Sequence, residues 1–375
     1  MAIPLIRTAA RLGICLVTAL AVCPLLPASA TAPASADGSP DIVVPRDHPT
    51  IQAAVDAASP GDRISVRAGV YREQVVIGKN LSITGAGDGK TTIQAPSTLT
   101  PGEDGGNSIV EIHEGASVSL SKLAVSGPGS GTCDSGALDT GIRVLGGARL
   151  DLGHASVSHI TDTPAAPCFH SGDAILIGDL PVGTGSATIH DTRITGYQGV
   201  GVVVLNEGSS ATIERSTVTG HPTLSTDGIE FVGGAVGRVT HSTISENECR
   251  EPDTACGPDV FNEFQHAGIV ADAPGTVLEH NRITGNQVGI YVAGTGLTIG
   301  NNDLRRNSYI GIALQDGSFT LRKDRITGGT HGVAVIAATT DTDAVLDGVK
   351  ITQTSGTPVG TFECCGFTAT ATVNP

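Results

Sequence analysis

Four consecutive segments share one layout and decide the fold: HAGIVADAPGTVLEHNRITGNQ (266–287), VGIYVAGTGLTIGNNDLRRNS (288–308), IGIALQDGSFTLRKDRITGGT (310–330) and HGVAVIAATTDTDAVLDGVKIT (331–352). Each has Gly-Ile or Gly-Val near its start, then a short hydrophobic run, a polar turn and further short runs. Large apolar residues recur at every second position of the opening runs, as at Val288, Ile290 and Val292. A period of two predicts β-strands, and a repeat of about 21 residues predicts a solenoid.

The repeat continues upstream with longer turns. Comparable opening runs are TGIRV (140–144), GDAILI (172–177), GVGVVV (199–204) and TDGIEF (226–231). Two further short runs typical of strands follow each of them. Three strands per repeat make one coil of a right-handed parallel β-helix, in which stacking buries the apolar face that a single coil leaves open. We therefore expect an all-β solenoid of roughly ten or more coils.

The first 30 residues have the features of a secretory signal peptide. Arg7 and Arg11 precede an apolar run over 12–26, and small residues lead to Ala30. The run is short for a membrane span, so we expect a secreted, extracellular protein with no membrane segment. A linker over 31–40, an N-terminal cap with the first coils over 41–96 and a β-helix over 97–375 follow.

Charge and composition limit the partners. The chain has 375 residues, and removal of residues 1–30 leaves 20 of the 22 basic side chains against 37 acidic ones, a net charge of −17. Such a surface disfavours nucleic acid, which is bound through basic patches. It also repels acidic glycans unless a cation mediates. We expect one elongated domain, because a solenoid grows by adding coils, and a protein that acts as a monomer.

Six of the eight cysteines lie beyond the signal peptide. In an exported protein they are most simply disulfides. Cys133 and Cys168 lie in loops at the same corner of neighbouring coils, so we expect them to be joined, and Cys249 and Cys256 to close a local loop. Cys364 and Cys365 are left over, and adjacent cysteines rarely bridge without strain.

The segment TIQAAVDAASPGDRISVRAGVYREQVVIGKNLSITGAGDGKTTI (50–93) predicts a short helix that Thr50 caps, with Ile51, Ala54, Val55 and Ala58 on one face. Such a helix would cover the first coil. The segment resembles the opening of pectin methylesterases and of other proteins in the pectin-lyase-like superfamily, which implies a right-handed parallel β-helix. The catalytic Gln-Asp-Thr and Asp-Phe-Ile-Phe-Gly segments of the esterases do not occur here, so no esterase residue is transferred.

Polar residues lead into the opening strands at Asp139, Asp173, Asp227, His266 and His331. With the outward strand residues Arg143 and Glu230 they predict a polar strip along one face, next to long loops. Loops on a rigid scaffold are where function concentrates. His170, His266 and His331 are candidate proton carriers at the edge of this strip, and the alternative for each is a surface or hydrogen-bonded histidine.

The motif STDGIE (225–230) resembles the NTDGID element of polygalacturonases, which implies a catalytic role for Asp227. The Gly-His-Gly and Arg-Ile-Lys elements of that family are absent. Paired carboxylates at Asp227 and Glu230 could supply acid and base. Asp173, Asp227 and Glu230 could instead hold Ca²⁺. Asp-Gly-Ile is also ordinary turn chemistry, so a purely structural Asp227 stays open.

Several other polar and aromatic residues recur at fixed places in the coils. Tyr291 and Tyr309 alternate with inward residues, so both are expected to point outward and to stack on sugar rings. A stacked or solvent-facing role is expected for His154, His190, His241 and His280. Unusual backbone angles in turns are expected at Asn281, Asn286, Asn301, Asn302 and Asn307.

Together these features predict a secreted β-helix that acts on an extracellular polysaccharide, as a lyase, hydrolase or epimerase, in a groove over the opening strands. This predicted activity requires no cofactor, or else it depends on bound calcium. The rival prediction is a non-catalytic carbohydrate-binding or matrix protein on the same scaffold, because a fold does not fix a reaction.

Overall fold

Three parallel sheets run side by side through the computed structural model, which describes residues 41–102, 105–130, 136–162, 172–179, 183–221, 226–248, 260–261 and 266–375. Residues 41–375 form one unit and are described by themselves. We name the 13-stranded sheet A, the 11-stranded sheet of shorter strands B, and the 11-stranded sheet that holds the opening strands of the repeats C; in the described part of this unit a complete coil passes through one strand of sheet C, then one of sheet A and one of sheet B. The predicted parallel β-helix is thereby confirmed.

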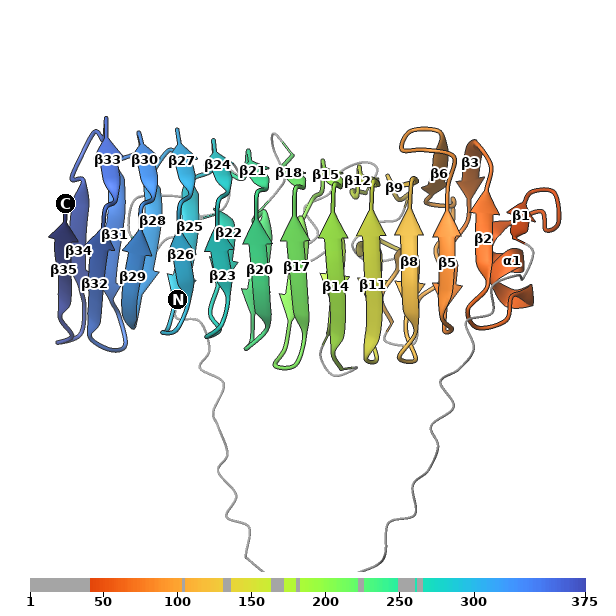
Figure 1. The fold of residues 1–375 in the computed structure, drawn as a ribbon, viewed down its shortest axis with the longest axis horizontal. Helices are drawn as coiled ribbons and strands as arrows, with labels where there is room; N and C mark the ends of the chain where they lie inside the picture. The colour runs from red at the N-terminus through yellow and green to blue at the C-terminus, as the bar shows by residue number, and fades with distance from the viewer. Residues whose placement is uncertain are drawn as a thin grey trace, which may run out of the picture. The chain divides into compact units, whose positions relative to one another are not determined.

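Sheet A has 13 strands among the described residues, and Figure 1 shows most of them stacked in a row. They are β1 (Ile42–Val44), β2 (Arg63–Val66), β5 (Leu81–Thr84), β8 (Ser117–Ser121), β11 (Ala148–Gly153), β14 (Gly185–His190), β17 (Ser210–Glu214), β20 (Val236–Thr240), β23 (Val277–Glu279), β26 (Thr298–Gly300), β29 (Ser318–Arg322), β32 (Thr342–Asp347) and β35 (Ala369–Asn374).

Sheet B has 11 shorter strands in the same described ranges. They are β3 (Gly69–Arg72), β6 (Thr91–Gln94), β9 (Ala124–Ser126), β12 (Ser156–Ser158), β15 (Arg193–Thr195), β18 (Thr217–Thr219), β21 (Thr243–Ser245), β24 (Arg282–Thr284), β27 (Asp303–Arg305), β30 (Arg325–Thr327) and β33 (Lys350–Thr352).

Sheet C contains the opening strands of the repeats, 11 of them in the part of the chain described. They are β4 (Val75–Ile77), β7 (Ser108–Ile112), β10 (Thr140–Val144), β13 (Asp173–Ile177), β16 (Val202–Leu205), β19 (Ile229–Val232), β22 (Ala267–Ala271), β25 (Val288–Ala293), β28 (Ile310–Gln315), β31 (His331–Ala337) and β34 (Val359–Glu363).

The core is a set of aliphatic columns inside the three sheets. Ile142, Ile175, Val202, Ile229 and Ile269 are paired from strand to strand in sheet C and are fully buried. Because every coil offers an apolar residue at the same inward position, each coil covers its neighbours.

In most coils a glycine precedes the inward residue of sheet C, and close packing requires it there. At Gly289, an added Cβ would lie 2.5 Å from the carbonyl oxygen of Gly311 and 2.7 Å from the side chain of Leu304. The Gly-Ile pattern of the repeat therefore marks a tight corner of the coil, because a side chain at the glycine position would collide with the next coil.

Helix α1 (Ile51–Ala57) packs against β1, β2 and β4 at the first coils. Thr50 caps it as predicted, since the Thr50 hydroxyl accepts a hydrogen bond from the Ala53 amide at 3.1 Å. Glu73 adds a second cap, because its carboxylate accepts the amides of Ile51 and Gln52 at 2.9 and 2.8 Å. Ile51, Ala54 and Val55 are buried on the inner face.

A buried polar ladder follows the corner between sheets A and B, and we call it the A–B ladder. In each step a backbone amide donates to the side-chain oxygen of the next coil, at 2.8–3.2 Å. Its members are Thr192, Ser216, Ser242, Asn281, Asn302 and Asp324. The ladder satisfies amides that would otherwise be buried without a partner.

A second ladder, the B–C ladder, follows the corner between sheets B and C. The Tyr197 hydroxyl donates to Asn247 at 2.5 Å, and the amides of Asn247 and Asn286 donate to Asn286 and Asn307 at 3.1 and 3.2 Å. The predicted turn role of the asparagines needs correction. Asn301 has a left-handed backbone, with φ of 57°, whereas Asn281, Asn286, Asn302 and Asn307 are buried in the ladders.

Candidate functional site

The strand register brings part of the predicted polar strip together on the outward face of sheet C. Arg143 on β10 is level with Leu176, Val203 and Glu230 on the next three strands. The same column continues to Tyr291 through β22. Arg143, Glu230 and Tyr291 therefore share one outward row, with apolar residues between them.

The residues that lead into these strands form two rows instead of the predicted single row. Asp173 and Asp227 each lie two positions before a paired inward isoleucine, at Ile175 and Ile229. Asp139 and His266 lie three positions before theirs, so the predicted alignment is wrong for those two residues. The loops before the strands differ in length, and this made the sequence register uncertain by one residue.

Asp227 and Glu230 form a carboxyl pair at the start of β19. Their side chains are half-buried and hydrogen-bonded to each other. Burial raises the pKa of both carboxyl groups, and the charge of Asp227 raises the pKa of Glu230 further. A pair of this kind holds one proton over a broad pH range, with the charge on Asp227 and the proton on Glu230.

Asp227 also has a structural bond. Its carboxylate accepts the backbone amide of Ala267 in the next coil at 2.5 Å. Asp173 accepts the amide of Val200 in the same way, at 2.8 Å. Each aspartate therefore ties its coil to the following one where a loop enters the sheet.

Asp173 belongs to the same electrostatic neighbourhood. Burial raises its pKa to about 7, the Val200 amide lowers it, the charge of Glu230 raises it and the charge of Arg143 lowers it. Asp173 therefore holds its proton more tightly than an exposed aspartate does, chiefly because it is buried.

Arg143 is a buried cation that is already engaged. Its guanidinium forms an ion pair with Asp179 at 3.1 Å, and its side chain is only 8% exposed. Glu111 is its neighbour in register on β7 and is also buried. Sequence reasoning missed Glu111 and Asp179, although the run SIVEI places Glu111 at the strand position of Arg143 one coil earlier.

The two tyrosines differ in access. Tyr291 is half-buried, its hydroxyl is bonded to the side-chain oxygen of Gln315, and burial raises its pKa to about 12. Tyr309 is 8% exposed and packs with Val288, with an edge-to-face contact to His331 at 5.8 Å. The expectation that Tyr309 offers an open face to sugars is not met, because it lies in the corner before β28.

The three acids predicted as calcium ligands do not converge on one point. Among the described residues, the one group of three side chains with ligand atoms within 4.8 Å of one another is His154, His190 and Asp191. Calcium binding by Asp173, Asp227 and Glu230 stays a prediction. Its chemistry would be charge neutralisation between these acids and an acidic sugar.

The predicted disulfides fall outside the structure. Cys133, Cys168, Cys249 and Cys256 all lie outside the described residues. Cys364 and Cys365 are bonded to each other.

The described residues form a hollow that is separate from the acids of sheet C. A shallow hollow of about 440 Å³ lies among Arg72, Gln94, Ser97 and Ser130 near the first strands of sheet B, and the acids of sheet C do not line it. In the described part of the chain, no helix has the length and apolar character needed to cross a membrane.

Comparison with known proteins agrees with the coil architecture. A family model described as "Right handed beta helix region" matches residues 182–355. The matched region has the right-handed parallel β-helix fold that the resemblance to the pectin-lyase-like superfamily implied. No curated protein sequence matched the chain.

Two solved structures illustrate the likeness. The Agl-KA catalytic domain is 15% identical with a TM-score of 0.53, over 86% of this chain and 64% of its own length. This chain therefore spans less than two thirds of that domain. The A-module of the mannuronan C-5 epimerase AlgE6 from Azotobacter vinelandii is 15% identical with a TM-score of 0.52, over 87% of this chain and 94% of the module. At these identities the likeness concerns the fold.

Proposed function

We propose that this protein is secreted and modifies an extracellular polysaccharide by acid–base chemistry on the outward face of sheet C. The observation that carries the proposal is the hydrogen-bonded pair of Asp227 and Glu230, which offers a charged base beside a protonated acid. The likeness to the A-module of a mannuronan C-5 epimerase supports a polysaccharide as the substrate class.

Proton transfer at a sugar carbon suits this pair better than hydrolysis. Glycoside hydrolases place their two carboxyl groups about 5–5.5 Å apart, or about 6.5–9.5 Å apart, to leave room for the sugar or a water molecule. A direct hydrogen bond brings Asp227 and Glu230 closer than either arrangement. In an epimerase or lyase one group removes a proton from carbon, and a neighbouring acid can donate a hydrogen bond to the sugar carboxylate.

A polyuronate fits this division of roles. The charged carboxylate of Asp227 would remove the proton next to the sugar carboxylate, and neutral Glu230 would stabilise the charge that develops there. Water would return a proton to the opposite face of the sugar to give the epimer, and Asp227 would release to solvent the proton it had removed. If the glycosidic oxygen instead leaves the adjacent carbon and takes up a proton from water, the product is an unsaturated sugar.

A non-catalytic glycan-binding role is the second candidate. The bond from the Ala267 amide to Asp227, and its counterpart from Val200 to Asp173, support a structural use of both aspartates. In that case the outward face would hold a polysaccharide without changing it.

A polysaccharide panel tests the proposal. Purified full-length protein is incubated with polyuronates and with neutral glucans, with and without Ca²⁺. Unsaturated products are followed by absorbance, reducing ends by assay, and epimers by NMR of the polymer. We expect a change in a polyuronate that Asp227→Asn abolishes. Binding without any product would favour the second candidate, and activity on neutral glucans with new reducing ends would contradict the proton-transfer assignment.

A further inference from the structure

A cluster of metal-ligating side chains lies on the outside of the A–B corner, apart from the acids of sheet C. His190 is the last residue of β14, Asp191 follows it, and His154 follows β11 in the preceding coil. The histidine rings meet edge to face, with centroids 5.7 Å apart. The ligand atoms of all three side chains lie within 4.8 Å of one another.

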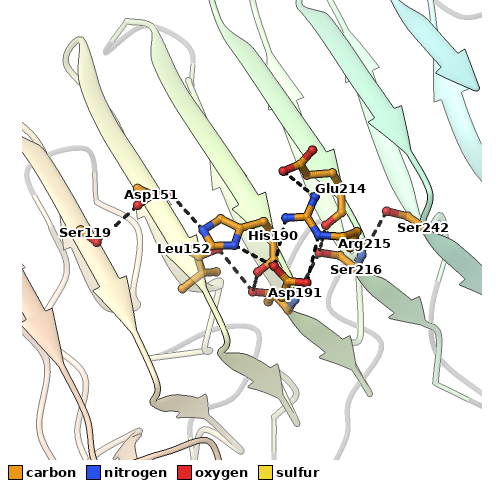
Figure 2. Close-up of polar contacts among 10 residues, drawn as sticks. Ser119, Asp151, Leu152, His190, Asp191, Glu214, Arg215, Ser216 and Ser242 are labelled. Atoms are coloured by element: carbon orange, nitrogen blue, oxygen red, sulfur yellow. Dashed lines mark hydrogen bonds and ion pairs between the residues drawn. The ribbon is translucent and has the colours of Figure 1, made fainter.

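His190 is held between two carboxylates, as Figure 2 shows. Its Nε2 lies 3.4 Å from Asp151, and its Nδ1 lies 3.1 Å from Asp191. A neutral imidazole carries one N–H and can donate to only one of them. The other nitrogen then directs a lone pair at a carboxylate, which is unfavourable unless a cation stands between them or the ring is protonated.

The arrangement resembles a histidine metal site, in which ligands contact the ion and a carboxylate behind the histidine orients its ring. Asp151 is placed to accept the Nε2–H and thereby to fix the ring with Nδ1 toward Asp191, as carboxylates commonly do behind metal-bound histidines. His154 and Asp191 supply the further nitrogen and oxygen ligands. All three ligand atoms are at or near the surface, which leaves the remaining coordination position to water.

From this geometry we propose that His154, His190 and Asp191 bind a divalent transition-metal ion of the zinc class, which pins the coils of β11 and β14 together. Two imidazoles and one carboxylate are a ligand set that suits zinc. Zinc–ligand bonds of about 2.0–2.1 Å in tetrahedral geometry place ligand atoms about 3.4 Å apart. The ligand atoms all lie within 4.8 Å of one another, so none of the gaps has to close by more than about 1.4 Å, within reach of side-chain rotation.

Arg215 competes with the metal for Asp191. Its Nε and terminal nitrogen donate to the two carboxylate oxygens, each at 3.1 Å, and Glu214 holds the same guanidinium at 2.9 Å. A carboxylate has lone pairs enough for both partners, but the guanidinium charge weakens cation binding. Asp191 is thus a ligand whose strength Arg215 moderates.

A second histidine pair further along the same corner provides a matched control. His241 follows β20 and His280 follows β23, and their rings stack with centroids 5.1 Å apart. His154 and His241 have the same left-handed backbone, with φ of 51° and 53°. In the described part of the chain the His241–His280 pair has no third ligand that meets the same distance limit.

The test is zinc content after equilibrium dialysis of the full chain against buffered zinc chloride, with metal and protein quantified together. We expect wild type and His241→Asn to hold one more equivalent of zinc than His154→Asn and His190→Gln. Asparagine is chosen at 154 and 241 because it tolerates the left-handed backbone. Equal zinc in all four proteins, or an equal loss in His241→Asn, would overturn the proposal.

A variant of a residue that is not itself a ligand distinguishes a preorganised metal site from nonspecific binding of zinc to surface histidines. Asp151→Ala keeps all three ligands but removes the acceptor behind His190, so the zinc affinity should fall about 10-fold. An unchanged affinity would refute the orienting role of Asp151. Thermal unfolding without zinc checks that each variant is folded, and zinc should raise the melting temperature of wild type and not that of His154→Asn.

Discussion

Asp324 and Asp227 are both aspartates whose pKa is raised by burial, yet they lie in opposite parts of the molecule. Asp324 lies inside the solenoid with none of its surface exposed and ends the A–B ladder. Asp227 is half-buried on the outward face of sheet C and shares a hydrogen bond with Glu230. A raised pKa therefore occurs at a structural position as readily as at a candidate site.

The partners distinguish the two aspartates. One carboxylate oxygen of Asp324 accepts hydrogen bonds from the backbone amide and the side-chain amide of Asn302, at 2.8 and 3.0 Å, and neither donor titrates near neutral pH. Asp227 is bonded to a second carboxyl group that keeps some access to solvent. Proton exchange needs a titratable partner and a path for substrate, and only the outward pair has both.

The largest effect is expected in the interior ladder. Asn302→Ala removes the side-chain bonds to Asp324 and Leu278 and leaves the Asn281 amide without its acceptor, while the backbone amide of residue 302 keeps its bond to Asp324. Each buried polar group left unpaired costs about 1–3 kcal/mol, so the free energy of unfolding should fall by about 4 kcal/mol. Denaturant unfolding measures it.

The neighbouring Asn301 is the control for that variant. It has a left-handed backbone and an exposed side chain. Asn301→Ala should cost only about 1 kcal/mol, from backbone strain. Equal losses in the two variants would contradict the distinction between ladder and turn asparagines.

A substitution in the outward pair of Asp227 and Glu230 is expected to lower activity and to leave stability nearly unchanged. Asp227→Asn keeps the shape and the turn-forming ability of the residue but removes the carboxylate. Activity on the polysaccharide found in the panel should fall 10²-fold or more, on the order of 3 kcal/mol in the barrier, with little change in the melting temperature. Retained activity, or loss through unfolding, would make Asp227 a turn residue.

The interior aspartate should give stability a pH dependence of the opposite kind from a salt-bridged acid. Burial raises the pKa of Asp324 to about 6 in the folded protein, against 3.8 for an unperturbed aspartate, so the folded state prefers the protonated form. Stability is therefore highest below about pH 4, falls as the pH rises to about 6, and is then lower by about 3 kcal/mol. Asp324→Asn should remove this part of the pH dependence, measured by denaturant unfolding at pH 4 and pH 8. A variant with the wild-type dependence would contradict the assignment.

The fold could be predicted because apolar residues that face the core recur once in every coil, and this repeat is visible in the sequence. The Gly-Ile step repeats because a side chain at Gly289 would meet Gly311, so the sequence period follows the coil period. The ladders were less visible. Asparagine is favoured both at left-handed turns and in buried ladders, and Asn301 and Asn302 are adjacent examples of the two uses.

The candidate site could be predicted only in part. The short spacing of Asp227 and Glu230 within one strand start brings them together without any knowledge of the loops. The relation of Asp139 and His266 to the strip depends on register across loops of unequal length, and there the prediction failed by one residue. Tyr309 is buried by side chains of neighbouring coils. The alternation of inward and outward residues along a single strand does not reveal such contacts.

The smallest expected effect is that of calcium, and it bears on the outward acids alone. If Asp227 and Glu230 hold Ca²⁺ together with Asp173, bound ion favours the folded state by mass action. For a dissociation constant of about 10⁻⁴ M, 1 mM Ca²⁺ adds about 1.4 kcal/mol, a rise of roughly 2 °C in melting temperature. Mg²⁺ should act less, because it demands octahedral geometry. The rise should vanish in Asp227→Asn and persist in Asp324→Asn, since the interior aspartate is out of reach of a hydrated ion. A melting temperature of wild type that does not respond to millimolar Ca²⁺ would remove the cation from the outward face, and with it the means to offset the repulsion between an acidic sugar and this acidic protein.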